Sequence, residues 1–280
     1  MSSSPTRPLM RYHGGKWRIA PWIIQHFPPH GVYVEPFAGA ASVFMRKPRV
    51  HGEVLNDIDG EIVNVFRVLR DPEKAKDLER LIRLTPFSRE EFEQSYDSTD
   101  CPIERARRII VRTSMGYGTT SLRKSRTGFR ARTYTQNQTG APCWVSWPDQ
   151  IRNYVYRLQG VTIENKDACE CIKLHDSSDT LFYLDPPYPG GCRVSGLKSY
   201  NFEMTDQEHE NLLDLLKDVS GMVVLSGYEN DLYNERLKHW KIAKCETLAD
   251  GAAKRTECLW INPAAWGKLN SHNPLLRYAE

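Results

Sequence analysis

The stretch "TLFYLDPPYPGG", residues 180–191, joins a run of apolar residues to an acid, two prolines and a tyrosine. Residues 180–184 are apolar or favour β structure, so they predict a buried strand that ends just before Asp185. Each proline fixes its own backbone and keeps the residue before it extended. The stretch therefore predicts a strand followed by a stiff turn, which presents a carboxylate and, at Tyr188, an aromatic ring.

Short apolar runs of the same kind predict further strands at residues 32–37, 53–56, 161–165, 222–226 and 257–261. Helical patterns lie between several of them. In "DGEIVNVFRVLR", residues 59–70, apolar side chains recur at positions i, i+3, i+4 and i+7. Strands that alternate with helices indicate an α/β fold with a mostly parallel, doubly wound sheet. The last pair, 241–247 and 257–261, predicts an antiparallel hairpin at the sheet edge.

Residues 71–150 interrupt this alternation. They begin with two helical patterns and a basic helix at 102–114, and then become polar, basic and interrupted by glycines. We interpret this segment as a smaller, mainly helical domain inserted into the sheet domain. The chain then divides into residues 1–70, 71–150 and 151–280, of which the first and last parts form the catalytic domain.

The composition indicates an intracellular globular protein. The chain has 280 residues and 40% hydrophobic content, enough to bury a full core. Its apolar runs are too short to cross a bilayer, and its N-terminus lacks the apolar run of a secretory signal. Seven cysteines without a C-x-x-C pair predict free thiols, with neither a disulfide framework nor a zinc site. We therefore expect a cytoplasmic protein.

The net charge of +3 conceals an uneven distribution. Residues 101–134 carry nine basic side chains against the single acid Glu104, so this segment has a charge of +8 and the remainder −5. The basic residues alternate with aromatic and small polar ones. This pattern favours a nucleic-acid surface over an ordinary solvated face.

Two acids lie where a parallel sheet binds its ligands, at the carboxyl ends of strands. "VEPFAGAASVF", residues 34–44, places Glu35 at a strand end before small residues that let the backbone approach a ligand. Asp57 ends the next strand, where an acid can accept hydrogen bonds from the ribose hydroxyls of an adenosyl ligand. Asp59 is predicted to be the N-cap of the following helix. The segment matches neither the dinucleotide nor the triphosphate glycine pattern.

The Asp-Pro-Pro-Tyr turn offers hydrogen-bond acceptors without competing donors. Neither Pro186 nor Pro187 has an N–H group, so the turn presents the Asp185 carboxylate and the Pro186 carbonyl beside the Tyr188 ring. An aromatic amine such as adenine N6 needs two acceptors for its N–H bonds and a stacking partner for its base. A purely structural turn is the weaker interpretation, because an unpaired Asp at a buried strand end is costly.

On these residues the sequence resembles the Dam-type (D12 class) DNA adenine N6-methyltransferases over nearly the whole chain. "YHGGK" at 12–16 is similar to the family's N-terminal cofactor motif and "VEPFAGAASVF" to its methionine-binding loop. "LNDID" resembles the segment of its ribose acid, "ENKDACECI" the segment near the cofactor adenine, and "DPPY" the catalytic motif. Two departures are that Ala41 replaces a glycine of the family loop and that Tyr12-His13 stands where Trp-Ala is frequent.

The resemblance implies a Rossmann-like sheet that uses S-adenosylmethionine, with an inserted target-recognition domain. It implies no metal, and S-adenosylhomocysteine as the product. The implied cofactor-binding residues are Tyr12, Gly14, Gly15, Lys16, Glu35, Pro36, Phe37, Ala38, Gly39, Asp57, Asp167 and Asp185. The implied catalytic residues are Asp185, Pro186, Pro187 and Tyr188. The resemblance further implies that a target adenine leaves the duplex, stacks on Tyr188 and attacks the methyl group through N6, without a covalent enzyme intermediate.

The expected partner is double-stranded DNA, bound by a monomeric protein of prokaryotic or phage type. The predicted DNA-binding residues are Arg105, Arg112, Arg123, Lys124, Arg126 and Arg130. Of these, Arg105 and Arg112 share a helix face with Arg108 and suit phosphate contacts, and Arg130 is our choice for a base contact. Arg107 is expected to be solvated.

Two alternatives remain open. The same fold could methylate another acceptor, cytosine N4 or an RNA adenine, although Asp before Pro-Pro-Tyr favours adenine. A binding protein could also keep the fold without turnover. The retention of Lys16, Asp57, Asp167, Asp185 and Tyr188 disfavours that reading.

Overall fold

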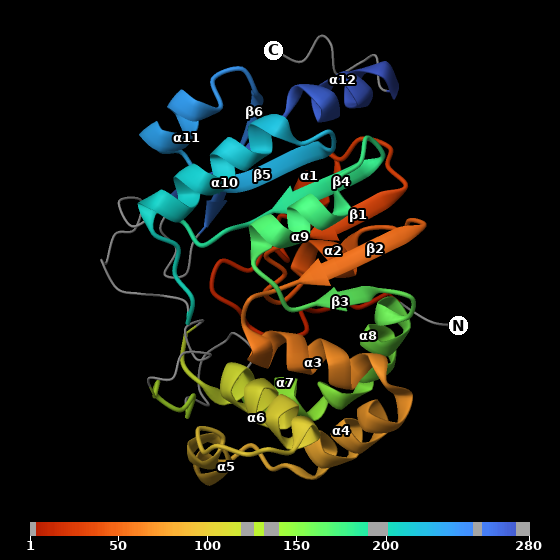
Figure 1. The fold of residues 1–280 in the computed structure, drawn as a ribbon. Helices are drawn as coiled ribbons and strands as arrows, with labels where there is room; N and C mark the ends of the chain where they lie inside the picture. Colours follow the sequence, from red (N-terminus) through yellow and green to blue (C-terminus); the bar gives the residue numbers. More distant parts are fainter. Residues whose placement is uncertain (1–3, 119–125, 132–139, 190–200, 249–253, 273–280) are drawn as a thin grey trace.

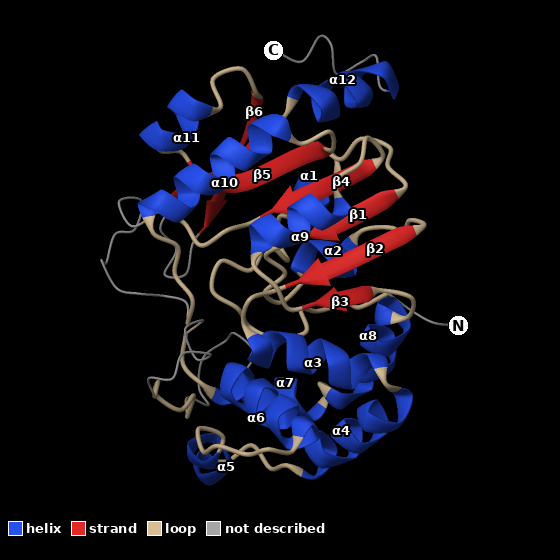
Figure 2. Ribbon diagram, in the orientation of Figure 1, coloured by secondary structure: helices blue, strands red, loops and turns tan. Residues whose placement is uncertain are grey.

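The structure is a computed structural model that describes residues 4–118, 126–131, 140–189, 201–248 and 254–272 (Figure 1). Within them seven strands form one sheet in the order β3-β2-β1-β4-β5-β7-β6 (Figure 2). The strands are β1 Val32–Glu35, β2 Gly52–Asn56, β3 Thr162–Glu164, β4 Thr180–Leu184, β5 Met222–Tyr228, β6 Lys241–Leu248 and β7 Lys254–Ile261. β7 pairs antiparallel with β5 and β6, and the other neighbours are parallel.

This sheet confirms the α/β fold, the strand positions and the antiparallel edge hairpin expected from the sequence. β1 ends at Glu35, before the predicted 37, because Pro36 has no N–H group to continue the ladder. β5 runs on to Tyr228, past the predicted 226, because β7 pairs with it as far as that residue.

The topology creates a ligand crevice beside β1. From β1 the chain builds outward through β2 to β3, then returns to place β4 on the other side of β1. In open α/β sheets the ligand binds at such a switch point, outside the carboxyl ends of the strands. The turn after β4 therefore opens toward the same space as the loops after β1 and β2.

Alternate residues of the strands lie on opposite faces of the sheet and belong to two hydrophobic cores. On one face Tyr33, Leu181 and Val224 pack with helices α1 (Ala20–Ile24), α2 (Ser42–Arg46) and α12 (Pro263–His272). On the other face Phe182 and Val223 pack with α9 (Ala168–His175), α10 (Asp206–Asp218) and α11 (Asp231–Arg236). This period of two is what a strand buried on both faces requires.

The remaining helices gather beyond β3 (Figure 1). They are α3 (Gly60–Arg70), α4 (Pro72–Leu84), α5 (Arg89–Gln94), α6 (Pro102–Met115), α7 (Gly140–Val145) and α8 (Ile151–Leu158), with a 3₁₀ turn at Pro148–Gln150. Asp59, Asp71 and Ser88 cap the starts of α3, α4 and α5. Buried residues of these helices belong to the same hydrophobic cluster as one face of the sheet. The division into three segments stays a prediction.

Capping also sets the position of α10. Thr205 and Glu208 form both halves of the predicted capping box, and the helix ends at Asp218, three residues before Gly221.

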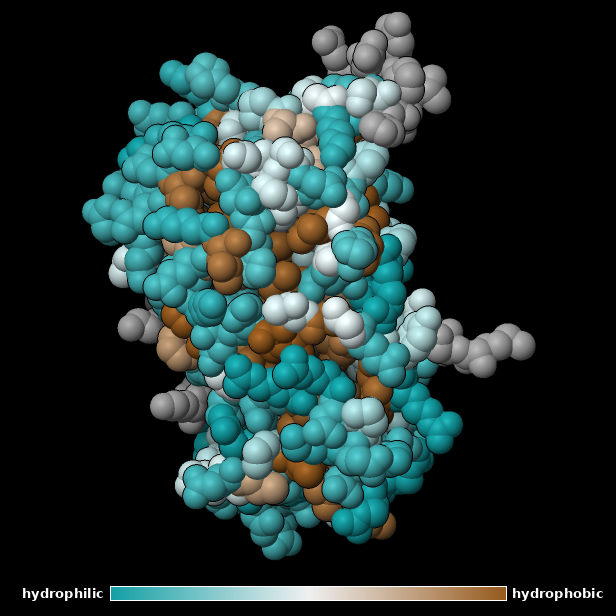
Figure 3. Space-filling model, turned by 45° about the vertical axis from the view of Figure 1, so that its right-hand side comes forward, coloured by the Kyte–Doolittle hydropathy of each residue, from teal (hydrophilic) through white to brown (hydrophobic). Residues whose placement is uncertain are grey.

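On the face drawn in Figure 3, hydrophilic residues cover most of the surface and hydrophobic ones show in patches between them. Within the described residues, no helix combines the length and apolar character needed to cross a membrane.

Candidate active site

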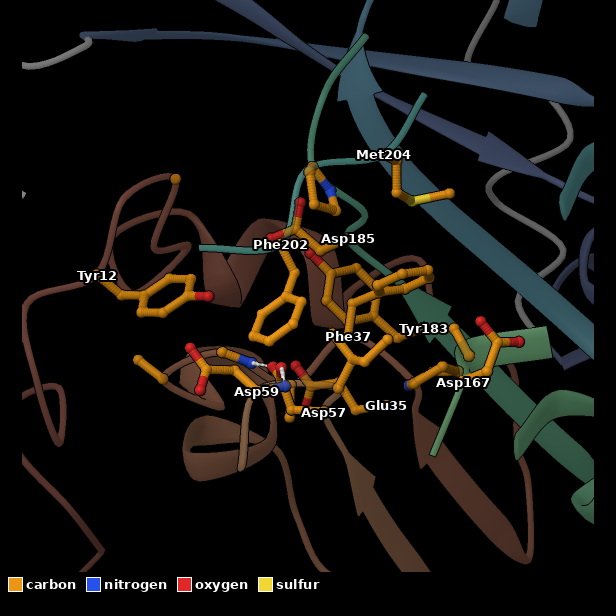
Figure 4. A pocket seen from close by; sticks show the side chains of 18 of the residues that line it. Tyr12, Glu35, Phe37, Asp57, Asp59, Asp167, Tyr183, Asp185, Phe202 and Met204 are labelled. Carbon is orange, nitrogen blue, oxygen red and sulfur yellow. Dashed lines mark hydrogen bonds between the residues drawn. The ribbon is translucent and has the colours of Figure 1, made fainter. Parts of the chain in front are cut away.

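A cavity of about 470 Å³ opens at the carboxyl ends of β1, β2 and β4 (Figure 4). The predicted cofactor-binding residues all line it, namely Tyr12, Gly14, Gly15, Lys16, Glu35, Pro36, Phe37, Ala38, Gly39, Asp57, Asp167 and Asp185. The topology thus brings five separate sequence segments to one space. Of the predicted catalytic residues, Asp185 and Pro187 are in the lining, whereas Pro186 and Tyr188 are not.

The loop after β1 supplies a buried carboxyl group and a close turn. Glu35 is 2% exposed, and its Oε2 atom has no hydrogen-bond partner among the described residues. Burial, and then the charge of Asp185, raise the pKa of Glu35 well above its ordinary value. Gly39 has a φ of +48°, and a Cβ atom there would lie 2.8 Å from the Tyr12 ring. Only glycine meets both conditions without strain.

Asp57 ties this loop to the end of β2. Its Oδ2 accepts a hydrogen bond from the Gly39 N–H at 2.8 Å, and its Oδ1 accepts one from the Asp59 N–H at 2.9 Å. Burial is the main reason that the pKa of Asp57 rises to about 6. Each oxygen retains further acceptor capacity, so the carboxylate can bind a ligand hydroxyl while it holds the loop.

Two acids of the lining also cap helices. Asp59 accepts from the Glu61 N–H, as its predicted N-cap role requires, and in addition accepts a hydrogen bond of 3.0 Å from the Asn201 side chain. Asp167 Oδ1 accepts from two N–H groups at the start of α9. This second cap fixes the Asp167 carboxyl group at the cavity wall.

Ala41, which replaces a glycine of the family loop, has a left-handed backbone with a φ of +50°. It is the residue before α2 and is fully buried. An alanine in this conformation costs about 1–2 kcal/mol relative to the right-handed region. The loop keeps the backbone shape that a glycine would favour, at the expense of local strain.

The Asp185 carboxylate lies in a polar cluster at the start of the turn after β4. Its Oδ1 atom is 2.9 Å from the Lys16 Nζ, and it accepts a hydrogen bond of 3.0 Å from the Ser226 hydroxyl. Tyr188 is 8% exposed, and its ring packs edge-on against Tyr228 with centroids 4.6 Å apart. Tyr188 is thus buried outside the cavity lining, whereas Asp185 lines the cavity.

Sequence reasoning missed several contributors to this site, including four from β7 and from the segment before α10. Glu257 of β7 accepts a hydrogen bond of 2.6 Å from the Tyr188 hydroxyl. Asn201, Phe202 and Met204 line the cavity from the segment before α10, and Figure 4 shows Phe202 in the same space as Tyr12. The acid in "KRTECLWIN" was visible as a charge in a buried strand, but its partner was not.

Several arginines of the basic helix α6 contact other side chains of the protein, and the predicted role of this helix in DNA binding stays a prediction. Arg105 pairs with Glu61, and the Arg112 guanidinium lies 5.4 Å from the centre of the Tyr96 ring. Arg107 was expected to be solvated, which is wrong: its side chain is 11% exposed and it pairs with Glu91 at 2.8 Å. On the face that was assigned to phosphates, a carboxylate of a neighbouring helix therefore engages Arg105.

Beyond α6, residues 126–131 return to the helix end. Gly116 and Phe129 form an antiparallel bridge, and Arg126 is exposed beside Tyr96, 5.7 Å from its ring centre. Arg130 is partly buried, and its pKa is lowered by burial and then by the charge of Arg11. Of the other predicted DNA contacts, Arg123 and Lys124 lie outside the described residues.

Within the described part of the chain, no group of three or more His, Cys, Asp or Glu side chains could hold a metal ion. Two buried acids line the cavity. Glu35 offers a carboxyl oxygen without a hydrogen-bond partner among the described residues, and Asp57 offers a second carboxyl group. Both groups can accept hydrogen bonds from a ligand.

Comparisons with known proteins agree with this geometry. The model of the D12 class N6 adenine-specific DNA methyltransferases matches residues 12–250. The chain is 26% identical to the type II methyltransferase M1.LlaDCHI of Lactococcus lactis subsp. cremoris, over 89% of this chain and 90% of that protein. It is 22% identical to the DNA adenine methylase of Haemophilus influenzae over 76% and 75% of the two chains. The DNA adenine methylase of Vibrio cholerae is also 22% identical, over 72% and 73%. The chain belongs to the D12 class of N6 adenine-specific DNA methyltransferases.

Proposed function

We propose that this chain transfers the methyl group of S-adenosylmethionine to N6 of an adenine that has left the DNA duplex. The observation that supports this most strongly is the position of Asp185. Its carboxylate borders the same cavity as the predicted cofactor-binding residues. The two residues that follow Asp185 are prolines, which have no N–H group to donate a hydrogen bond. An acceptor at the edge of a cofactor cavity is what a nucleophilic amine requires.

The bound cofactor would supply a methyl group on a sulfonium centre, which is an electrophile that needs no metal. Glu35 and Asp57 would hold its ammonium and ribose groups, and Gly39 would allow the close approach of the loop. Lys16 donates a hydrogen bond of 2.7 Å to the Gly14 carbonyl, and so fixes the N-terminal turn beside the cavity. These residues orient the methyl group and exclude water from it.

Asp185 and the Pro186 carbonyl would accept the two N–H bonds of N6. The contacts of Asp185 with Lys16, Ser226 and Tyr188 all involve Oδ1, so Oδ2 is the atom that we assign to the amine. Two accepted hydrogen bonds raise the electron density of N6, and the proton that N6 loses passes to the solvent or to an acceptor of the turn. Stacking of the base on Tyr188 stays a prediction, because this ring is buried outside the cavity lining.

DNA would approach beside residues 126–131. Arg126 is exposed, and Arg130 lies within the electrostatic influence of Arg11. The neighbouring guanidinium groups of Arg11 and Arg130 favour an anionic partner such as phosphate. We propose the inserted segment 71–150 as the target-recognition region. The monomeric state and the intracellular location of the protein stay predictions.

The test is a methylation assay that identifies the product base. Purified protein, S-adenosylmethionine with a labelled methyl group and duplex DNA are incubated, and the DNA is digested to nucleosides. We expect label in N6-methyladenine in the wild type and in a variant of the exposed Asp218, and none in Asp185→Ala. Label in N4-methylcytosine, preference for RNA, or cofactor binding without any product would each contradict the proposal.

A further inference from the structure

We propose that Glu257 is a positioning residue that holds Lys16 and Tyr188 in place beside Asp185, and that turnover depends on its charge. This inference rests on the proposed function, because the group it positions is the acceptor for the target amine. Glu257 belongs to β7 and does not line the cavity, so it acts through its neighbours.

The contacts form a closed ring of four side chains. The Tyr188 hydroxyl donates to Glu257 Oε1 at 2.6 Å and lies 3.5 Å from Asp185 Oδ1. The Lys16 Nζ is 2.9 Å from Asp185 Oδ1 and 3.7 Å from Glu257 Oε1. The same ammonium lies 5.0 Å from the centre of the Tyr188 ring. Each member therefore contacts both of its neighbours in the ring.

Burial makes these contacts strong. The Lys16 and Glu257 side chains are 6% and 5% exposed, whereas Asp185 is 20% exposed toward the cavity. Burial also raises the pKa of Glu257, and the adjacent Lys16 charge opposes this rise. An ammonium at this depth needs a compensating negative charge. Glu257 supplies one that does not compete for the substrate.

That second charge decides how Lys16 affects Asp185. With Glu257 present, the ammonium is shared between two carboxylates, and Asp185 keeps Oδ2 for the target amine. Without it, the ammonium of Lys16 would interact more strongly with Asp185, which would become a weaker acceptor for the target amine. The phenol of Tyr188 would also lose its hydrogen bond of 2.6 Å to Glu257.

The topology explains how a residue of β7 reaches the active site. β7 lies between β5 and β6 and runs antiparallel to β5, with Glu257 opposite Tyr228. The beginning of β7 therefore lies where the parallel strands β4 and β5 end. Tyr228 also packs against the Tyr188 ring. The strand pairing therefore fixes the position of Glu257 relative to Tyr188.

The test compares Glu257→Gln, Tyr188→Phe and the double variant with Glu246→Gln, an exposed acid on the neighbouring strand β6. Turnover, S-adenosylmethionine affinity and thermal unfolding are measured for each. We expect Glu257→Gln to lower kcat by about 10- to 100-fold, the effect of a small displacement of reacting groups. Cofactor affinity should change by less than about threefold, and Glu246→Gln should match the wild type. The double variant should be little worse than the more impaired single variant, because both changes break one contact.

A structural role alone would lower the unfolding temperature of Glu257→Gln but leave kcat of the folded protein unchanged, and this result would overturn the inference. Fully additive losses in the double variant would also overturn it. Tyr188→Phe, which keeps the ring, provides the same test of the contact if Glu257→Gln does not fold. Lack of N6-methyladenine in the wild type would instead overturn the proposed function and this inference together.

Discussion

The Gly39 N–H donates a hydrogen bond of 2.8 Å to the Asp57 carboxylate, and this bond joins the loop after β1 to the end of β2. The two residues are far apart in sequence, yet both line the cavity. The acid expected to bind ribose thus also shapes the loop that approaches the cofactor. Changes at either residue should alter cofactor binding.

Gly39→Ala should weaken S-adenosylmethionine binding. The new Cβ would lie 2.8 Å from a Tyr12 ring atom, so that ring must move within the cavity. Gly160→Ala is the matched control, because Gly160 has a φ of +77° but no atom within 4 Å of the new Cβ. Both variants should lose about 1–2 kcal/mol of folding stability from the left-handed backbone. Calorimetry that finds equal cofactor affinity in the two variants would contradict the role of the Gly39 loop.

Cofactor affinity should rise with pH through about 6. The pKa of Asp57 is raised to about 6 in the folded protein from an ordinary 3.8, and ribose hydroxyls prefer to donate to the ionised form. Affinity should therefore fall below this pH, by at most about tenfold per pH unit. Folding stability has the opposite trend: the contribution of protonated Asp57 is complete below 3.8 and is lost as the pH rises through about 6. Asp57→Asn should bind the cofactor more weakly, and its affinity should not change with pH in this range. If the affinity of the variant still changes with pH as in the wild type, the effect belongs to another acid, such as Glu35.

Lys16→Met should destabilise the fold by roughly 3 kcal/mol, because it leaves Asp185 and Glu257 without their shared cation in a buried cluster. Adding Glu257→Gln should restore part of this loss. Lys244→Met is the control: Lys244 pairs with Glu229 at the surface, and its loss should cost less than about 1 kcal/mol. Denaturant unfolding measures all three. A double variant less stable than Lys16→Met alone would show that the cluster is not electrostatically coupled.

Three arginines of the inserted segment 71–150 should differ in their effects on DNA binding. Arg126→Ala should weaken binding to all DNA sequences and lower the slope of affinity against salt by about one unit. Arg130→Ala should instead relax the site preference at one position. Arg105→Ala should leave both unchanged, because its guanidinium pairs with Glu61. Filter binding at several salt concentrations, with methylation mapping, distinguishes these results. A lower salt slope in Arg105→Ala would show that Arg105 contacts phosphate despite its pairing with Glu61.

The sequence predicted those features that depend on local pattern. A strand that ends in an acid is visible in "TLFYLD", and parallel strands bring such ends together, so Glu35, Asp57 and Asp185 could be grouped before the fold was known. Glu257 was missed because β7 is antiparallel and presents its beginning at that edge. Only the pairing of distant strands reveals this.

The spacing of the arginines along α6 also predicted only part of their environment. It shows which arginines share a face of the helix, but not which acids of other helices lie next to them. Glu61 of α3 and Glu91 of α5 are distant in sequence, and they engage Arg105 and Arg107. Ala41 could not be predicted from local propensity either. Alanine disfavours a left-handed backbone, yet Ala41 adopts one because the surrounding loop imposes this conformation.

The most direct test of the account is single-turnover methyl transfer by Asp185→Ala, measured together with its S-adenosylmethionine affinity. We predict that the variant forms no detectable N6-methyladenine while it binds the cofactor within about tenfold of the wild type, a change of about 1.4 kcal/mol. N6-methyladenine formed at the wild-type rate would contradict the assignment of Asp185 as the acceptor for the target amine.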